Sequence, residues 1–463
     1  MLKKAKFDYN NILIVLSLVI ALYVIFNIKN YKQADKVISW DVTNYYSYLP
    51  ATFIYGDVLL NFTKEQPEKW YDKFVPLTTP TGGKVIKMSM GLSYCYAPFF
   101  AIAHVIAKIT PYQDGGYSLP YRLALMLSSV CFFALGLIYL KKILIRLYSK
   151  QVVFITLLVI GLGTNLFYYT AIRSAMSHSY NFALITLFVW LSIQWHNKPK
   201  IVNSTLIGLL IGLIVLIRPT NILVVIIFLL YRVSSLNDLK DKLKLFLSKY
   251  YLILIILLAF VLVWIPQLLY WKAVSGQYFY FSYQGERFFF GNPQILKGLF
   301  SYRNGWLIYT PLMSMALVGL FFIYKNQKAF FWPIMIYSIL SIYVITSWWC
   351  WWYVGYGNRA FIDLYGVMAI PFAAFMSWIF EKKQWLRTVT ISIILLFVSL
   401  NLFQTYQYYK GYIQFDSMSK AAYWDVFLKA DPKNSYWGLL EKPDYKKALE
   451  GIYENHPPKD QSE

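Results

Sequence analysis

The sequence has little charge. Only 14% of its 463 residues are Asp, Glu, Lys or Arg, whereas soluble domains carry about 25%. Hydrophobic residues make up 58% of the chain, and apolar runs of roughly 17–25 residues recur, each long enough to cross a membrane as a helix. The runs are continuous and not alternating, which excludes membrane-spanning strands. The sequence therefore predicts an all-α polytopic membrane protein.

Cysteine and acidic residues are also scarce. Cys95, Cys131 and Cys350 have neither metal-ligand spacing nor the even number of a disulfide framework, so we interpret them as small packing residues. Acidic residues number 22 against 44 basic ones, which gives a net charge of +22. Nucleic-acid-binding proteins are also basic, but these Lys and Arg residues lie in short loops between apolar runs. We therefore expect a membrane as partner and no nucleic acid.

Several motifs of soluble enzymes are absent. The sequence contains no nucleophile elbow, no DxD pair, no dinucleotide fingerprint and no Cys/His cluster. These absences argue against common hydrolases and against nucleotide-sugar enzymes that hold a metal through DxD. We therefore expect no cofactor, because a divalent cation has no DxD motif to support it.

Eleven apolar runs are predicted to span the membrane. They are 12–28, 121–140, 152–171, 179–195, 203–217, 219–231, 251–270, 306–324, 330–347, 361–380 and 386–404. The first has no small-residue cleavage site after it, so we interpret it as a retained span and not a signal peptide. A further run, 91–109, begins with residues of interfacial character and is predicted to lie along the membrane or dip into it.

Positive charge sets the predicted orientation. If the N-terminus with Lys3, Lys4 and Lys6 is cytoplasmic and 91–109 does not cross, every short loop rich in Lys and Arg is cytoplasmic. The chain would be a multi-pass protein of the inner (plasma) membrane. Residues 1–404 would form a transmembrane module, with a long outer loop over 29–120 that contains interfacial helices. Residues 405–463 would form a small outer tail.

Polar residues at the predicted span ends all fall on the outer side in this topology. They are Asp41, Asp57, Lys87, Arg122, His178, Arg218, Asn221, Glu286, Arg287, Arg303, Asn304, Arg359 and Asp363. Charged groups at membrane depth are costly and usually functional. We therefore predict a single site that faces away from the cytoplasm.

Asp41 follows directly on the first span. Residues 41–55 are predicted to form an amphipathic interfacial helix with Asp41, Tyr45 and Tyr48 on one face, which Pro50 bends or ends. Partial desolvation would raise the pKa of Asp41 and suit it to accept a proton. Helix N-capping is the alternative role, and the sequence alone does not separate the two.

Other candidates each have a functional and a structural interpretation. Asp57 is a second acid or a turn residue, and Lys87 either binds an anionic headgroup or extends to the interface by snorkelling. His178 opens a span but has no metal ligand at i+4, so packing is its alternative role. Arg218 and Asn221 interrupt an apolar stretch, where Arg218 either binds a lipid phosphate or forms a structural ion pair.

The stretch 348–363 contains four Trp within five residues, followed by Tyr356-Gly357-Asn358-Arg359. Aromatic faces stack on sugars and hold cations, and Gly355 and Gly357 allow a tight turn before Arg359 enters the next helix. Arg359 and Asp363 are predicted to be i, i+4 partners. The alternative is an aromatic membrane anchor with a local salt bridge.

These features resemble the GT-C superfamily of integral-membrane glycosyltransferases, especially bacterial members related to protein O-mannosyltransferases and lipid A aminoarabinose transferases. The resemblance rests on one span, a long outer loop that opens with Asp41, the segment 87–109, and Arg122 at the next span. Tyr356–Arg359 is similar to an aromatic-Gly-x-Arg element of many members. The chain departs from the family at 87–90, where many members have Lys-Pro-Pro-Leu, and it has no second acid beside Asp41.

The resemblance implies a GT-C-like bundle of about eleven spans that uses a polyprenyl-phosphate-linked sugar. Asp41 would be the base toward an acceptor hydroxyl on a glycan, lipid or protein, and Arg218 and Arg359 would stabilise the departing phosphate, with inversion. The substrate site would include Tyr45, Tyr46, Asp57, Lys87, Arg122, His178, Arg218, Asn221, Arg359 and Asp363. The alternatives are a lipid-linked glycan polymerase or ligase and a polyprenyl-lipid transporter, although a transporter would need polar groups at the membrane midplane.

Overall fold

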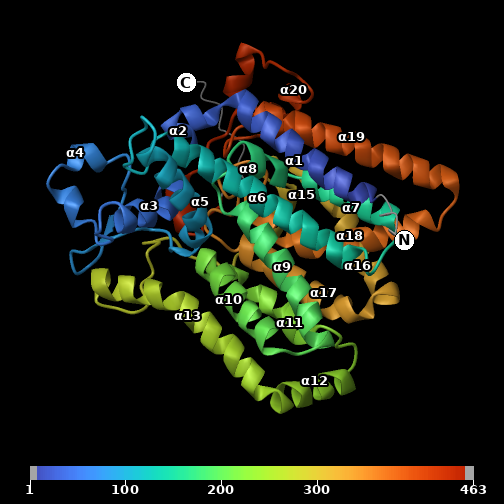
Figure 1. Cartoon of the computed structure of the whole chain (residues 1–463). Coiled ribbons are helices and arrows are strands. Elements are labelled where there is room, and N and C mark those ends of the chain that lie inside the picture. Colours follow the sequence, from blue (N-terminus) through green and yellow to red (C-terminus); the bar gives the residue numbers. More distant parts are fainter. Residues whose placement is uncertain (1–7, 454–463) are drawn as a thin grey trace.

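The computed structural model describes residues 8–453 and is almost entirely helical (Figure 1). Within these residues the strands are β1 (Leu77–Thr78) and β2 (Lys84–Val85), which pair antiparallel in the first long loop. Lys3, Lys4 and Lys6, and residues 454–463 of the predicted tail, lie outside the described residues.

Helices occupy all eleven ranges that were predicted to span the membrane. Seven of these ranges are single helices: α1 (Tyr9–Ile28), α6 (Leu119–Leu144), α9 (His178–Asn197), α10 (Ile201–Ile217), α13 (Tyr250–Ser275), α17 (Lys328–Thr346) and α19 (Gln384–Tyr409). Two others begin with a 3-10 helix: η3 (Pro219–Val224) with α11 (Val225–Leu230), and η4 (Arg359–Leu364) with α18 (Tyr365–Phe380).

Two predicted spans are wrong as continuous helices. The range 152–171 divides into α7 (Lys150–Leu162) and α8 (Leu166–Ala171), and the range 306–324 divides into α15 (Trp306–Tyr309) and α16 (Met313–Asn326). Pro311 explains the second break, because proline has no N–H to donate and disfavours helical geometry in the residue before it. The first break follows Gly163, a residue of low helix propensity.

The predicted number of spans is not confirmed. Among the described residues six helices are long and apolar enough to cross a membrane: α1, α6, α13, α17, η4 with α18, and α19. Shorter apolar helices are α7, α10, η3 with α11, and α16. The structure thus has the all-α polytopic architecture, while eleven spans and the non-crossing position of α5 stay predictions.

The remaining helices lie mostly in loops. The first long loop holds η1 (Asn30–Lys32), α2 (Ala34–Val37), α3 (Asp41–Phe53), η2 (Asn61–Lys64), α4 (Pro67–Trp70) and α5 (Gly91–Lys108). The later ones are α12 (Leu236–Ser248), α14 (Ile295–Phe300), α20 (Lys420–Val426), η5 (Asn434–Leu439) and α21 (Tyr445–Leu449). Helix α3 confirms that a helix begins at Asp41, although it continues past Pro50 to Phe53 and does not end there. Its interfacial position stays a prediction.

The centre of the bundle is α18. In the span Arg359–Phe380, 89% of the most apolar window is buried, against 22% for α13 and for α19. Helix α18 packs against α7, α9 and α16, while α10 packs against α9 and α13, and α1 against α6 and α7. Residues at the start of η4 are therefore held in the middle of the molecule, with helices on several sides.

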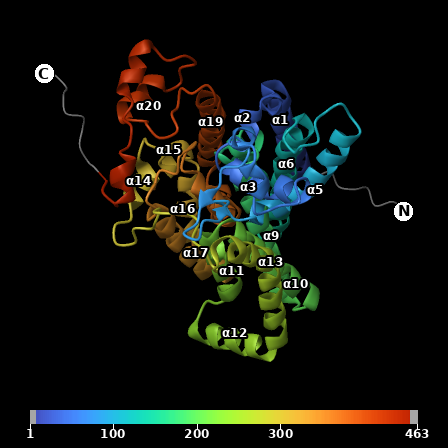
Figure 2. The same cartoon turned by 90° about the vertical axis from the view of Figure 1, so that its left-hand side faces the viewer.

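The predicted cytoplasmic loops meet one another. Lys141 pairs with Asp8, Gln327 donates to the carbonyl of Leu147, and the N–H of Arg232 donates to the carbonyl of Ala329. The opposite ends of these helices therefore also share one face, where α2, α3, α4 and α20 gather (Figure 1). Figure 2 views that face directly, with α3 near its centre and α14 and α20 to one side. Which side of the membrane this face meets stays a prediction.

The segment after α19 folds back onto this same face. The N–H of Gly355 donates to the carbonyl of Phe415, and the N–H of Glu441 donates to the carbonyl of Ser417. Tyr436 is fully buried within the segment. The C-terminal segment therefore packs on the loops near η4, while the outer position predicted for it stays a prediction.

Candidate active site

Asp41 forms an ion pair with Arg359. Helix α3 begins at Asp41 because Trp40, with φ 56° and ψ −128°, turns the chain sharply before it. Nη2 of Arg359, at the start of η4, lies 2.9 Å from Oδ2 of Asp41. The N-cap position is Trp40, which makes no side-chain capping bond, so the N-cap alternative for Asp41 is wrong.

The charge state of Asp41 also differs from the prediction. Burial raises the pKa of this carboxyl group, but the charge and hydrogen bond of Arg359 and the charges of Lys87 and His178 outweigh burial and hold the pKa below its ordinary value. The predicted raised pKa is therefore wrong for this state, because a cation from the far end of the chain faces the acid. Asp41 is ionised at neutral pH and can accept a proton.

Asp363 is a second, fully buried acid. Its Oδ2 accepts hydrogen bonds from Nη1 of Arg218 at 2.9 Å, Nδ2 of Asn221 at 2.8 Å and Nδ2 of Asn181 at 3.1 Å. Arg218 thus has the structural ion pair that was one of its two predicted interpretations. The sequence analysis missed Asn181, whose signal was an amide one helical turn after His178 in an apolar span.

The predicted pair of Arg359 with Asp363 is wrong. Both residues lie in η4, a 3-10 helix with three residues per turn, so side chains four positions apart point about 120° away from each other. Arg359 consequently reaches Asp41 and Asp363 reaches Arg218. Helix η4 therefore contributes one residue to each of two ion pairs, Arg359 near its start and Asp363 near its end.

His178 opens α9, as predicted. Its ring is fully buried, Nδ1 lies 4.0 Å from Oδ1 of Asp363, and the ring centroid lies 4.6 Å from that of Tyr169. Neither ring nitrogen nor Oδ1 of Asp363 has a hydrogen-bond partner among the described residues. His178 thus borders the Asp363 pair, in contact with an aromatic ring.

A third ion pair joins Lys87 to Glu286. Nζ of Lys87 lies 2.5 Å from Oε1 of Glu286 and 5.2 Å from the ring centroid of Tyr283. Nε1 of Trp349 donates to Oε2 of the same glutamate at 3.1 Å. Lys87 is therefore held by a partner and does not snorkel, and the pair connects the first loop to the loop after α13 and to the Trp-rich stretch.

The tyrosines of α3 divide into two sets. Tyr45 is buried one turn from Asp41, and burial together with the charge of Asp41 raises its pKa to about 12. Tyr46 lies about 140° around the helix from Asp41, is fully buried, and donates to the carbonyl of Gly116. The structure thus brings Tyr45 to the site and gives Tyr46, which was also predicted there, a packing role.

Asp57 and Arg122 are not joined to these pairs. The carboxylate of Asp57 accepts the backbone N–H groups of Leu59, Asn61 and Phe62 at 2.9, 2.6 and 3.3 Å, which is the turn role. Nε of Arg122 is buried without a hydrogen-bond partner among residues 8–453. No ion pair between Arg122 and an acid is present in this part of the chain.

The Trp-rich stretch makes the predicted tight turn. Gly357 has φ +47°, and a Cβ there would lie 2.6 Å from Cβ of Tyr309. Nδ2 of Asn165 donates to the carbonyl of Gly357 at 2.5 Å and fixes the turn before Arg359. Trp351 and Trp352 are buried, packed in one cluster with Ala448 of the C-terminal segment, so their faces are not free to stack on a sugar as the sequence suggested.

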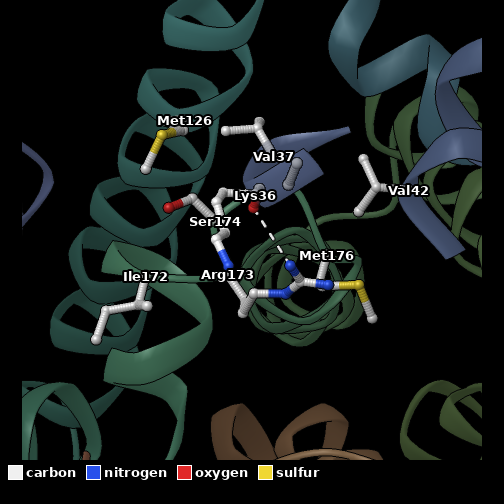
Figure 3. Close-up of a pocket in the computed structure, with 9 residues that line it drawn as sticks. Lys36, Val37, Val42, Met126, Ile172, Arg173, Ser174 and Met176 are labelled. Atoms are coloured by element: carbon white, nitrogen blue, oxygen red, sulfur yellow. Dashed lines mark hydrogen bonds between the residues drawn. The ribbon is translucent and has the colours of Figure 1, made fainter. Parts of the chain in front are cut away.

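The loop between α8 and α9 positions the start of α3. Figure 3 shows Arg173 reaching toward α2, with Nη1 3.2 Å from the carbonyl oxygen of Lys36. The same nitrogen lies 3.4 Å from Oγ of Ser39, two residues before Asp41. Met176 of this loop places its sulfur 3.9 Å from Nη1 of Arg359. The loop therefore contacts the chain just before Asp41 and also contacts Arg359, and so it helps to hold the two residues of the ion pair in place.

The site contains acids, guanidiniums and aromatic rings. Within residues 8–453 no three His, Cys, Asp or Glu side chains are grouped so that they could hold a metal ion. What the arrangement offers chemically is one partly exposed carboxylate, 31% exposed, beside a guanidinium that is 18% exposed. Such a pair combines a proton acceptor with a donor of paired hydrogen bonds to an oxyanion.

The sequence matches no protein-family model and no curated protein. The structure is similar to that of the oligosaccharyltransferase AglB from the archaeon Archaeoglobus fulgidus, solved in complex with an inhibitory peptide and a dolichol-phosphate. The TM-score is 0.50 and the sequence identity is 14%. The two proteins are similar in fold.

The similarity covers 86% of this chain and 55% of AglB, so the chain spans little more than half the length of that protein. At this level of identity the likeness concerns the fold alone. The predicted helical membrane-enzyme fold therefore has a solved counterpart, while the resemblance to bacterial O-mannosyltransferases and aminoarabinose transferases is not confirmed.

Proposed function

We propose that this protein is a membrane glycosyltransferase that moves a sugar from a polyprenyl-phosphate-linked donor to an acceptor hydroxyl. The reaction takes place on the extracytoplasmic side of the inner membrane, with inversion at the anomeric carbon. The observation that carries the proposal is the ion pair of Asp41 with Arg359, at the end of a GT-C-like bundle. The dolichol-phosphate in the AglB complex supports a lipid phosphate as the leaving group.

Two guanidiniums are suited to the donor phosphate. Arg359 and Arg218 each make one hydrogen bond to a carboxylate, and a guanidinium has five N–H donors. Nε of Arg359 has no hydrogen-bond partner among the described residues. Both side chains keep part of their surface exposed, 18% for Arg359 and 22% for Arg218. Phosphate oxygens would occupy the remaining donors through paired hydrogen bonds.

Donor binding would also activate the base. When phosphate oxygens engage Arg359, the guanidinium's hold on Asp41 weakens and the influence that lowers the pKa of Asp41 decreases. The carboxylate then has a higher affinity for a proton at the moment when the sugar is in place. Asp41 is in this way a stronger base in the donor complex than in the free protein.

The chemical step follows directly. An acceptor hydroxyl gives its proton to Asp41 while its oxygen forms a bond to the anomeric carbon of the sugar. The bond from that carbon to the phosphate oxygen breaks, and its electron pair leaves on the polyprenyl phosphate. Arg359 and Arg218 stabilise the charge that grows on the phosphate. Because a single displacement occurs and no covalent intermediate forms, the configuration at the anomeric carbon inverts.

A lipid-linked glycan ligase is the second candidate. The fold likeness to an oligosaccharyltransferase favours it, because the same phosphate chemistry would serve a donor that carries a longer glycan. Purified protein supplied separately with a monosaccharide donor and an oligosaccharide donor on the same polyprenyl phosphate distinguishes the two. A transporter receives no comparable support, because the ion pairs gather at one end of the bundle and not at its midplane.

The proposal is tested by Asp41→Asn in purified protein, with transfer measured from a polyprenyl-phosphate sugar. We expect transfer to fall by about 10²–10⁴-fold, the usual contribution of general-base catalysis, with donor binding retained. Asp35→Asn is the matched control, because Asp35 lies in the same loop and its side chain is 75% exposed. If the Asp41→Asn protein transfers sugar at nearly the wild-type rate, Asp41 is not the base.

A further inference from the structure

A large pocket lies beside the candidate active site, beneath the C-terminal segment. Its volume is about 880 Å³, within the usual range for small-molecule sites. The loop around α14, the Trp-rich stretch and the segment from η5 to α21 enclose it. Representative lining residues are Lys297, Arg303, Trp352, Leu440, Lys442 and Tyr453. None of these residues belongs to the ion pairs described above.

The pocket carries an excess of positive charge. Its lining includes five cationic side chains, Lys297, Arg303, Lys420, Lys442 and Lys447, against two acidic ones, Glu441 and Asp444. Burial lowers the pKa of Arg303. The negative charges of Glu441 and Asp416 raise this pKa, but they do not fully offset the effect of burial. Burial and the charge of Arg303 likewise lower the pKa of Lys297. Neither Lys297 nor Arg303 forms an ion pair with an acid among the described residues, and the nearby Glu441 and Asp416 oppose the effect of burial on Arg303 only in part.

Arg303 has hydrogen-bonding capacity that the protein does not use. Its Nη2 donates to the backbone carbonyl of Glu441 at 2.8 Å, which brings no charge compensation. Its Nε is buried and has no hydrogen-bond partner among the described residues. A buried guanidinium N–H without an acceptor costs free energy that a bound anion would recover.

Aromatic rings stand next to both cations. The guanidinium of Arg303 lies 5.9 Å from the ring of Trp352, and Nζ of Lys297 lies 5.9 Å from the ring of Tyr453. Cations bind acidic groups, and ring systems pack against the apolar C–H faces of a sugar. Trp352 is buried, so Tyr453 is the ring that a sugar can face. A cationic pocket with such a ring favours a saccharide that carries acidic groups over a bare inorganic anion, which needs no aromatic surface.

The pocket is one short loop away from Arg359. Trp351 and Trp352 line it, and the chain turns through Gly355 and Gly357 before it reaches Arg359. Nδ2 of Asn358 donates to the carbonyl of Trp351 at 2.9 Å and ties the pocket wall to the residue that precedes Arg359. A ligand longer than one sugar that is held here lies close to the Asp41 site.

We propose that this pocket binds the acceptor, and that the acceptor is an acidic glycan. This inference rests on the proposed glycosyltransferase function and adds the chemical class of the second substrate. The acidic groups lie against Lys297 and Arg303, and a sugar face lies against Tyr453, because Trp352 is buried. The hydroxyl that receives the new sugar lies at the Trp351 end of the pocket, which Asn358 joins to the backbone that carries Arg359.

Binding of a defined probe tests the inference without any sugar transfer. Full-length protein in detergent is titrated with a fluorescent tetramer of galacturonic acid and, in parallel, with a neutral tetramer of glucose. We expect the acidic tetramer to bind at least about tenfold more tightly, because hydrogen bonds to charged groups are worth more than neutral ones. The variant Lys297→Gln/Arg303→Gln should lose about tenfold or more of that affinity.

A matched pair of lysines supplies the control. Lys442 lines the pocket and Lys446 does not, and both are exposed in the same segment. Lys442→Gln should weaken binding of the acidic tetramer, whereas Lys446→Gln should leave it unchanged. Retained binding of the polyprenyl-phosphate donor by the double variant shows that the protein is folded. Arg303→Lys, which keeps the positive charge, should bind the acidic tetramer more tightly than Arg303→Gln does.

The outcomes separate this inference from the function on which it rests. Equal binding of both tetramers, or wild-type affinity in the double variant, overturns the acceptor pocket. Protein that transfers sugar but does not bind the acidic tetramer overturns the pocket alone. Protein that binds the tetramer through Lys297 and Arg303 but transfers no sugar from any polyprenyl-phosphate donor supports an acidic-glycan pocket and overturns the proposed function.

Discussion

The guanidinium of Arg359 lies 2.9 Å from the carboxylate of Asp41, although 318 positions separate the two residues in the sequence. Asp41 begins α3 in the first long loop, and Arg359 begins the segment that leads into the central helix α18. The pair therefore connects the first long loop to the central helix. The predictions below test what this pair and its surroundings contribute.

The first prediction concerns paired hydrogen bonds to the donor phosphate. Arg359→Lys and Arg218→Lys keep the positive charge but remove the planar, paired donors. We expect each to lower kcat/KM for the polyprenyl-phosphate donor by about tenfold to a hundredfold, the range for hydrogen bonds to charged groups. Steady-state transfer assays measure this. Arg387→Lys, in the first turn of α19, is the control. Wild-type kinetics in both site variants would remove these arginines from donor recognition.

The second prediction concerns pH. Because Arg359 holds the pKa of Asp41 below its ordinary value, which is about 3.9, the acid limb of kcat/KM in the wild type should lie below that pH. Arg359→Gln removes the main influence that lowers the pKa, so its acid limb should move to higher pH. Rates measured across the acidic range for both proteins check the shift. Superimposable acid limbs would show that Asp41 does not control this limb.

The lowered pKa of Asp41 also has a consequence for the stability of the folded protein. Asp41 has a lower pKa in the folded protein than in the unfolded chain, so its ion pair stabilises the fold at pH above the unfolded value. This stabilisation is lost as the pH falls through the lowered pKa of the folded state. Asp41→Asn should therefore reduce the difference in thermal stability between neutral and acidic pH, measured by unfolding in detergent.

The third prediction concerns the turn before Arg359. Gly357 has φ +47°, and an added Cβ would lie 2.6 Å from Cβ of Tyr309. Gly357→Ala should destabilise the protein by about 1–3 kcal/mol from backbone strain, with the steric clash in addition. Transfer should fall as Arg359 is displaced. Gly291→Ala is the matched control, because nothing lies within 4 Å of a Cβ there. Equal stability of the two variants, measured by thermal unfolding, would contradict this account of the turn.

The fourth prediction concerns orientation in the membrane. Reporter fusions near residue 235, at the start of α12, should read cytoplasmic, and fusions near residue 430, after α20, should read extracytoplasmic. The reason is that Lys and Arg concentrate in the loops predicted to be cytoplasmic. A cytoplasmic signal near residue 430 would mean that the number of spans is even, and that α5 or another apolar helix has been assigned wrongly.

Several features of the fold follow from neighbouring residues and were predicted correctly. Long apolar runs predicted the helices, the sequence around Asp41 predicted a helix that begins there, and a helix was predicted to begin at His178. Gly355 and Gly357 were predicted to form a tight turn. Each of these depends on hydropathy, periodicity or backbone freedom within a few positions, which are local properties of a sequence.

Local rules failed where helix type or distant packing decided the outcome. The predicted pair of Arg359 with Asp363 assumed an α-helix, but the chain forms a 3-10 helix there. The predicted pKa of Asp41 had the wrong sign, because desolvation was considered without the facing guanidinium. Of the two effects expected of Pro50, bending or ending α3, the second is wrong, because the helix continues to Phe53.

The sequence by itself determined that this is a helical membrane protein whose polar residues lie at the ends of its spans, because hydropathy and charge are read directly from consecutive residues. Only the tertiary structure decided that Asp41 pairs with Arg359, Lys87 with Glu286 and Arg218 with Asp363. It also decided that the C-terminal segment covers Trp351 and Trp352. The physical reason is that each of these contacts joins segments far apart in the chain, and their approach depends on how the helices pack together.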